Sequence, residues 1–201
     1  MKLRELTDEE IRRIYAERLP GDFAPDEIKP LSRIEREMAA GRYACYGYFG
    51  EDGIAAYAFF IINERYAMVD YLAVREDLRG QGTGSRFIRA MMEELMQQYA
   101  FVLLETEDPS FAADEEDKRI RERRLRFYQH NGLTETGVTS TVWNVDYRVL
   151  ALPVGTVPAP DEVRKIYTGM YRNMLTKELF DENVNVHGAR SWDRRAAFGF
   201  I

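Results

Sequence analysis

The segment with the clearest chemical meaning is a loop with three glycines at alternate positions, Arg79-Gly80-Gln81-Gly82-Thr83-Gly84-Ser85. A strand-like run at residues 67–74 precedes the loop, and a run with helical spacing of apolar residues, 87–99, follows it. Glycines leave backbone N–H groups uncovered, and the first turn of a helix carries partial positive charge. The loop is therefore suited to hold a phosphate or pyrophosphate group.

The spacing of the glycines indicates which kind of phosphate ligand such a loop binds. A nucleotide-triphosphate loop ends in Gly-Lys-Ser/Thr, where this chain has Gly84-Ser85-Arg86. A dinucleotide loop fits better, because Gly80, Gly82 and Glu105 stand near the expected places. However, the third glycine is one residue too early, and residues 75–79 intervene between strand and loop. A nicotinamide-dependent oxidoreductase is thus a weak alternative, as is a tight turn without a ligand.

Two motifs in the same order resemble those of the GNAT superfamily of acetyl-CoA-dependent N-acetyltransferases. Residues 71–84 contain an apolar strand, a short connector and the pattern Arg79-x-x-Gly82-x-Gly84, which is similar to the acyl-CoA signature of that family. Further on, Phe127-Tyr128 is followed by Gly132-Leu133, which resembles the second hallmark. The resemblance covers roughly residues 1–150.

The resemblance implies acetyl-CoA as co-substrate and a set of residues that bind it. Backbone amides of the loop would hold the CoA pyrophosphate, with Arg79 opening the loop. Strand residues ahead of the loop would pair with the pantetheine arm, and an N–H group near Val74 would polarise the thioester carbonyl. The cofactor-binding set implied in this way is Leu72, Ala73, Val74, Arg79, Gly80, Gln81, Gly82, Thr83, Gly84 and Ser85.

Acetyl transfer to an amine needs a neutral nucleophile, a stabilised oxyanion and a proton for the departing thiolate. The resemblance implies Tyr128 as the general acid. Leu104-Glu105-Thr106 is similar to a strand end that carries the base in ribosomal-protein and other GNAT enzymes, so Glu105 is the first candidate base and Glu107 the second. Asp108-Pro109 replaces an Asn that contacts the cofactor arm in many members. Two plain alternatives stay open: Tyr128 packs as a helix-end aromatic, and Glu105 is simply solvated or pairs with an arginine at the strand end.

An acidic run and a basic run follow the candidate base. Residues 105–117 contain seven carboxylates and no basic residue, whereas residues 118–126 contain six basic residues. The acidic run either attracts a cationic amine or is neutralised by the basic run behind it. The first interpretation favours a polyamine, an aminoglycoside-like amine or a basic peptide terminus as acceptor.

The elements that position these residues follow the order β-α-α-β-β-β-α-β-α-β-β. We expect strands near residues 2–6, 43–49, 54–62, 67–74, 101–104, 138–145 and 147–152. A capping box at Thr7–Glu10 predicts a helix that ends at Pro20-Gly21, and further helices are expected before Gly41, over 87–99 and over 118–128. This order predicts an α/β fold with a mixed α+β sheet and helices on both faces.

Residues 153–201 form an expected C-terminal extension to a GNAT-like domain at residues 1–152. A helix is predicted at about 161–180, because its apolar residues recur with helical spacing. Its apolar face must bury against this domain or a second subunit, which leaves a homodimer open. The tail 181–201 shows no period, and its Trp192, Phe198, Phe200 and Ile201 suggest docking.

Composition narrows the class of protein. The chain has 201 residues, a formal net charge of −6 and one cysteine, Cys45, so an internal disulfide and a cysteine-built zinc site are excluded. Neither His130 nor His187 has a ligand-spaced partner, so no metal is expected. The longest apolar run, 54–62, is too short to span a membrane, and the N-terminal residues lack the apolar core of a signal peptide. We expect a cytoplasmic protein with neither membrane nor nucleic-acid partners.

The function expected from the sequence is transfer of acetyl from acetyl-CoA to a primary amine by direct attack, with a small cationic amine as acceptor. A protein N-terminal or lysine acetyltransferase is one alternative. A module that binds acyl-CoA without catalysis is another.

Overall fold

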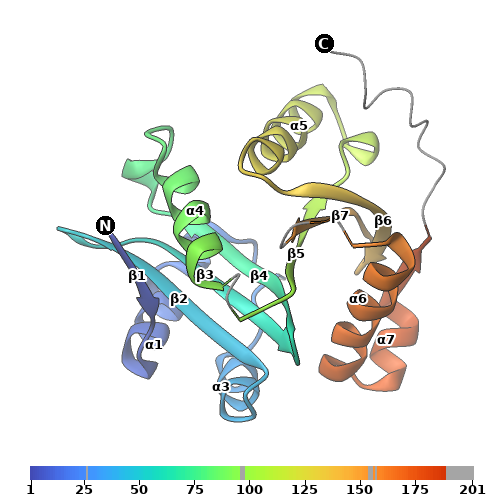
Figure 1. The fold of residues 1–201 in the computed structure, drawn as a ribbon, viewed down its shortest axis with the longest axis horizontal. Coiled ribbons are helices and arrows are strands. Elements are labelled where there is room, and N and C mark those ends of the chain that lie inside the picture. The colour runs from blue at the N-terminus through green and yellow to red at the C-terminus, as the bar shows by residue number, and fades with distance from the viewer. Residues whose placement is uncertain (26, 96–97, 154–155, 157, 189–201) are drawn as a thin grey trace. The chain divides into compact units, whose positions relative to one another are not determined.

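The computed structural model describes residues 1–25, 27–95, 98–153, 156 and 158–188. The chain forms two compact units, Met1–Val102 and Leu103–Ile201 (Figure 1). Each unit has strands of its own and helices that pack on them.

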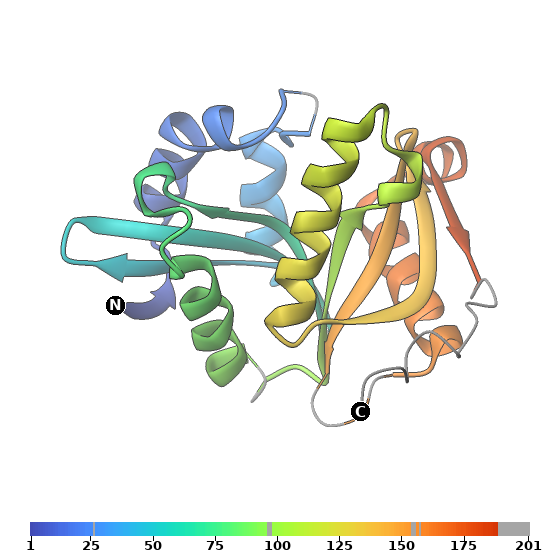
Figure 2. The same ribbon diagram turned by 90° about the horizontal axis from the view of Figure 1, so that it is seen from above.

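The first unit is built on an antiparallel sheet with the strand order β1-β2-β3-β4. These strands are β1 (Lys2–Glu5), β2 (Tyr43–Gly50), β3 (Gly53–Asn63) and β4 (Tyr66–Val74). Its helices are α1 (Asp8–Glu17), α2 (Leu19–Asp22), α3 (Leu31–Ala39), the short 3-10 helix η1 (Glu76–Leu78) and α4 (Thr83–Leu95). Figure 2 shows α1 and α3 on one face of this sheet and α4 on the other. Both faces are covered, which is why β3 is buried continuously from Ala55 to Ile61.

The second unit has the strand order β5-β7-β6-β8, and β6 pairs antiparallel with both β7 and β8. Its strands are β5 (Phe101–Glu107), β6 (Thr134–Val142), β7 (Val145–Pro153) and β8 (Val184–His187). Its helices are the short 3-10 helix η2 (Pro109–Phe111), α5 (Glu115–His130), α6 (Pro160–Met174) and α7 (Lys177–Asn183). Helix α5 lies on one face of these strands, and α6 and α7 lie on the other (Figures 1 and 2). The predicted mixed α/β fold with helices on both faces is confirmed.

Local signals in the sequence predicted several element ends correctly. The Thr7 side chain accepts from the Glu10 N–H, while the Glu10 carboxylate accepts from the Thr7 N–H at 2.9 Å, so the predicted capping box is present. Gly41 ends α3 with φ +67°, as expected for a residue just past a helix. The turn Glu51-Asp52 joins β2 to β3 at the predicted position.

Two predictions about element ends were wrong. Pro20-Gly21 does not end the first helix: α1 stops at Glu17, and Pro20 lies in the first turn of α2, where a missing N–H costs nothing. The last hairpin turns earlier than predicted, because Trp143 and Asn144 both adopt positive φ, 46° and 63°. No glycine marks that turn, so its position could not be predicted from the residue types.

The predicted single helix at 161–180 is two helices. Leu175 is extended, with ψ 154°, and the Thr176 hydroxyl caps α7 by accepting from the Leu179 N–H. Part of the tail then docks as strand β8, whereas the four apolar residues named for docking lie outside the described residues. The apolar face of α6 packs on β6 and β8 of its own unit, which removes the need for a second subunit to cover it.

Within the described residues, no helix is both long and apolar enough to cross a bilayer.

Candidate active site

The glycine loop has the backbone conformation that the sequence predicted. Gly80 and Gly82 have φ +73° and +74°, a region that residues with a Cβ avoid. Helix α4 begins directly afterwards at Thr83. Among the described residues, none accepts a hydrogen bond from the backbone amides of residues 80–85. A row of unpaired N–H groups at a helix start is the arrangement that binds an anion.

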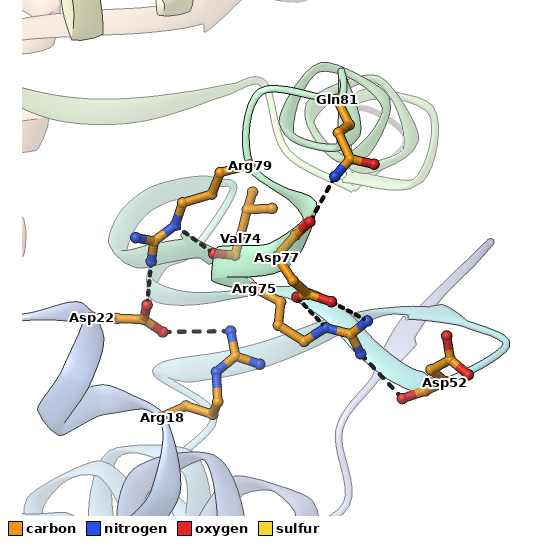
Figure 3. A network of polar contacts seen from close by, with 8 residues as sticks. All are labelled: Arg18, Asp22, Asp52, Val74, Arg75, Asp77, Arg79 and Gln81. Atoms are coloured by element: carbon orange, nitrogen blue, oxygen red, sulfur yellow. Dashed lines mark hydrogen bonds and ion pairs between the residues drawn. The ribbon is translucent and has the colours of Figure 1, made fainter.

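Arg79 fixes the loop to the end of β4 and to α2 (Figure 3). Its Nε donates to the Val74 carbonyl at 2.9 Å, and its Nη2 lies 2.6 Å from Asp22 Oδ1. The Asp22 side chain, which is 8% exposed, also accepts from the Tyr57 hydroxyl at 2.9 Å. Arg79 was predicted to bind the cofactor, and this geometry gives it a second role as a brace for the loop.

A second set of contacts closes the connector between strand and loop. Arg75 pairs with Asp77 at 2.7 Å, and the Gln81 side-chain amide donates to the Asp77 carbonyl at 2.6 Å (Figure 3). Arg75 also donates to the backbone carbonyl of Asp52 in the β2–β3 turn. Residues 75–79, which lie between the strand and the loop and have no counterpart in a dinucleotide loop, are therefore held in place by these contacts.

The strand segment predicted to hold the pantetheine arm lies beyond a bulge in β4. Leu72, Ala73 and Val74 pair in register with β3, but Asp70 is skipped between the pairs Phe59–Tyr71 and Phe60–Val69. The Asp70 carboxylate accepts hydrogen bonds from the Lys29 ammonium, at 2.5 Å, and from the Tyr43 hydroxyl. A bulge redirects the strand that follows it, and these contacts hold it in place.

Tyr128, the predicted general acid, lies in the last two turns of α5 and is 9% exposed. Burial raises the pKa of its phenol above the ordinary value, and the charge of Arg124 opposes the shift. Its hydroxyl makes no hydrogen bond with another residue of the described part of the chain. Although the residue is buried, its hydroxyl oxygen is not among the described side-chain atoms that are both buried and unpaired, so this proton is accessible to a ligand.

Glu105, the first candidate base, is held by two tyrosines of α6. The Tyr167 hydroxyl donates to Oε1, and the Tyr171 hydroxyl lies 2.9 Å from Oε1 and 2.8 Å from Oε2. The Tyr167 oxygen in turn lies 2.7 Å from the Ser140 hydroxyl on β6. Both tyrosines belong to the apolar residues whose helical spacing predicted a helix here, and no local pattern indicates that they reach Glu105.

Glu107, the second candidate, has a different environment. Although it stands two residues from Glu105 on the same strand, it contacts α5: its carboxylate lies 2.9 Å from Arg124 and 3.4 Å from Arg121. Both oxygens of the Glu107 carboxylate are thus already engaged by guanidinium groups, which turns them toward α5. Glu105 is therefore the stronger candidate.

The acidic run is largely ion-paired. Glu116 pairs with Arg119 and Asp117 with Arg121, so the basic run neutralises part of it. Asp108, which the resemblance sets in place of an Asn, is 5% exposed and pairs with Arg148 at 2.9 Å. Asp114 caps α5 by accepting from the amides of Glu116 and Asp117. The contacts favour neutralisation over attraction of a cationic substrate.

Neither the cysteine nor the potential metal ligands among the described residues form a reactive site. Cys45 is buried, and burial raises the pKa of its thiol far above the ordinary value, as expected for a core residue. No cluster of three or more His, Cys, Asp or Glu side chains suited to a metal exists among the described residues.

Comparison with known proteins relates these features to a family. YjbC of Bacillus subtilis (strain 168), assigned as an acetyltransferase, is 32% identical over 115 residues, or 57% of this chain. The match covers 54% of YjbC, so the chain spans about half the length of this relative.

Two solved structures share the fold. A structure assigned to a GNAT-family acetyltransferase of Bacteroides thetaiotaomicron superposes with a TM-score of 0.63 at 18% identity, covering 89% of this chain and 98% of that one. An aminoglycoside 6′-N-acetyltransferase complexed with coenzyme A has a TM-score of 0.58 at 18% identity, covering 79% of this chain and 99% of that one. The model of the acetyltransferase (GNAT) family matches residues 9–132. Because this match takes in more than half of the chain, the protein belongs to the GNAT family of acetyltransferases.

Proposed function

We propose that this protein transfers the acetyl group of acetyl-CoA to a primary amine by direct attack, without a covalent enzyme intermediate. The observation that carries the proposal is the row of unpaired amides at residues 80–85, held by two glycines with positive φ in a chain of the GNAT family. These amides bind the CoA pyrophosphate. Leu72, Ala73 and Val74 hold the pantetheine arm, and Arg79 braces the loop.

Two residues of the second unit move the protons. Glu105 takes a proton from the ammonium form of the acceptor, so that the neutral nitrogen attacks the thioester carbonyl. The C–N bond forms, the tetrahedral oxyanion collapses as the C–S bond breaks, and the nitrogen, now positively charged, loses its second proton to solvent, from which Tyr128 regains a proton after the reaction. Tyr128 then protonates the departing thiolate, which its unpaired hydroxyl supports. Glu107 is the second candidate for the base, and its ion pairs with α5 weaken that assignment.

A small cationic amine is the acceptor class that we favour. Support comes from the name of one structural neighbour, which acts on the 6′-amine of an aminoglycoside. The acidic run gives less support than its composition suggested, because Glu107, Asp108, Glu116 and Asp117 are ion-paired. A peptide amine, from a protein N-terminus or a lysine, is the second acceptor class.

Thermal unfolding with ligands tests the cofactor. A ligand at one hundred times its dissociation constant adds about 2.7 kcal/mol, which is several degrees for a chain of this size. We expect acetyl-CoA and CoA to raise Tm and NAD to leave it unchanged. A shift with NAD alone would contradict the assignment of the glycine loop.

Thiol release from acetyl-CoA then tests the reaction. The amines supplied are spermidine, an aminoglycoside with a free 6′-amine, and a short peptide with free N-terminal and lysine amines. Turnover with the first two supports the small-amine class, and turnover with the peptide alone supports the second class. Binding of acetyl-CoA without thiol release in any arm would favour a non-catalytic acyl-CoA-binding module.

A further inference from the structure

Helix α6 contributes two side chains to the surroundings of the candidate base, although it lies outside the residues that match the family model. We propose that Tyr167 and Tyr171 are positioning residues, which orient the Glu105 carboxylate and keep it ionised so that it can accept a proton. This inference rests on the proposed role of Glu105 as the base.

The two tyrosines are one helical turn apart, so their side chains lie on the same face of α6. Their rings meet edge to face with centroids 5.2 Å apart, and both residues are buried, Tyr167 completely. Val163 and Met170, also fully buried, fix the helix against its unit. The two hydroxyls are therefore held rigidly at the end of β5.

The hydrogen bonds have a defined direction. The single proton of the Tyr167 hydroxyl is donated to Glu105 Oε1, so the Ser140 hydroxyl, 2.7 Å away, must donate to the Tyr167 oxygen. Tyr171 shares its proton between the two carboxylate oxygens. Ser140, Tyr167 and Tyr171 thus form a chain of donors that ends on Glu105.

Donors of this kind favour the charged form of a carboxyl group, because the oxygens of a carboxylate are stronger acceptors than those of the neutral acid. Burial and the charge of Glu105 raise the pKa of Tyr167 well above the ordinary value, so this phenol stays protonated at neutral pH. The tyrosines counteract the cost of partial burial of Glu105. They also fix the direction in which its oxygens face.

The catalytic part of the chain then extends beyond residue 152. The sequence suggested a catalytic domain at residues 1–152 with an extension at 153–201. If α6 holds the base, residues 160–174 are part of the catalytic machinery rather than an appendage.

A double-mutant cycle tests the coupling. The variants are Tyr167→Phe, Tyr171→Phe, both together, Glu105→Gln, and Glu105→Gln combined with both tyrosine changes; each keeps the size of the side chain. Hydrogen bonds to a charged group predict that each single tyrosine change lowers kcat by about tenfold with little change in KM for acetyl-CoA. In the Glu105→Gln background the same changes should lower kcat no further. Tyr48→Phe removes a hydroxyl from a buried tyrosine of the first unit, stacked on Phe87, and should leave kcat unchanged.

A second readout needs no acceptor. The side-chain carboxyl carbons of the glutamates are labelled with carbon-13 and observed by NMR. The resonance of Glu105 is identified by its absence in Glu105→Gln, and its chemical shift is followed against pH. Loss of both phenol donors should raise the pKa of Glu105 by about one unit or more. An unchanged pKa in the double tyrosine variant, whose fold is verified by circular dichroism, would overturn the inference.

The outcomes separate the two proposals. Full activity in Glu105→Gln would remove Glu105 as the base and so contradict the proposed mechanism, whatever the tyrosines do. Loss of activity in Glu105→Gln with full activity in both tyrosine variants would leave the base intact and contradict only the positioning role.

Discussion

Asp22 and Arg79 are 57 residues apart in the sequence, and their side chains meet at 2.6 Å. The same guanidinium donates to the carbonyl of Val74, the last residue of β4 (Figure 3). One ion pair therefore joins helix α2, the end of β4 and the start of the glycine loop. The Asp22 side chain is only 8% exposed, so solvent and salt screen this pair less than a pair of two exposed side chains.

Replacement of Asp22 should loosen the glycine loop. Asp22→Asn removes the charge that holds Arg79 and weakens the contact with Tyr57, so we expect a loss of about 1–3 kcal/mol in the free energy of unfolding. The KM for acetyl-CoA should rise by about tenfold, because the loop amides lose their fixed positions. Urea unfolding and steady-state kinetics measure the two effects. Asp52→Asn is the matched control, since Asp52 braces Arg75 through its backbone carbonyl. Equal KM values for Asp22→Asn and wild type would exclude this bracing role.

Gly80 should tolerate no side chain, for conformational reasons alone. A Cβ at Gly80 meets no atom within 4 Å, but φ is +73°, so Gly80→Ala should cost about 1–2 kcal/mol of stability or displace the loop. We expect the Kd for CoA to rise by about tenfold in calorimetry, since displaced amides no longer converge on one anion. Gly21→Ala is the matched control: it has equal space and no positive φ, and should bind CoA normally. Normal CoA affinity in Gly80→Ala would contradict the assignment of the loop.

Tyr128→Phe should separate chemistry from binding. The variant loses the proton donor but keeps the buried ring, so we expect kcat to fall by about tenfold or more while KM for acetyl-CoA changes by less than about twofold. A general acid acts while protonated, and burial raises the pKa of Tyr128 above its ordinary value. Activity that depends on this proton should therefore persist to higher pH than a free phenol would allow. Measurement of kcat from pH 7 upward checks both points, and unchanged turnover would remove Tyr128 from the mechanism.

The Asp108–Arg148 pair should make the free energy of unfolding depend on pH in the acidic range. Burial would raise the pKa of Asp108, but hydrogen bonds from Arg148 and the Ser110 amide outweigh it and hold that pKa below its usual range. The carboxylate therefore contributes stability that is fully present above about pH 4, the ordinary value, and is lost as pH falls through the lower folded-state pKa.

Asp108→Asn removes one charged partner of Arg148, which keeps its ion pair with Glu135, so the free energy of unfolding at pH 7 should fall by about 1–3 kcal/mol. The gap between variant and wild type should narrow as pH falls below about 4. Denaturant unfolding at pH 7, 5, 4 and 3 measures it. A gap that stays constant over this range would show that the charge of Asp108 contributes nothing.

Features that depend on neighbours in the sequence could be predicted from the sequence alone. The capping box at Thr7, the glycine after α3 and the two glycines of the loop each act within a few residues, so their residue types are sufficient signals. The order of strands and helices followed from hydrophobic periodicity, which reports on the faces that each element buries. Together with the spacing in the two motifs, this order indicated the family.

Tertiary structure decided which partner each functional side chain has. Glu105 is held by Tyr167 and Tyr171, 62 and 66 residues further along, and Glu107, only two residues away, pairs with arginines of another helix. Such partners depend on how helices pack against strands, and no local pattern encodes that packing. A tyrosine on an apolar helix face looks like a core residue until the fold shows what its hydroxyl reaches.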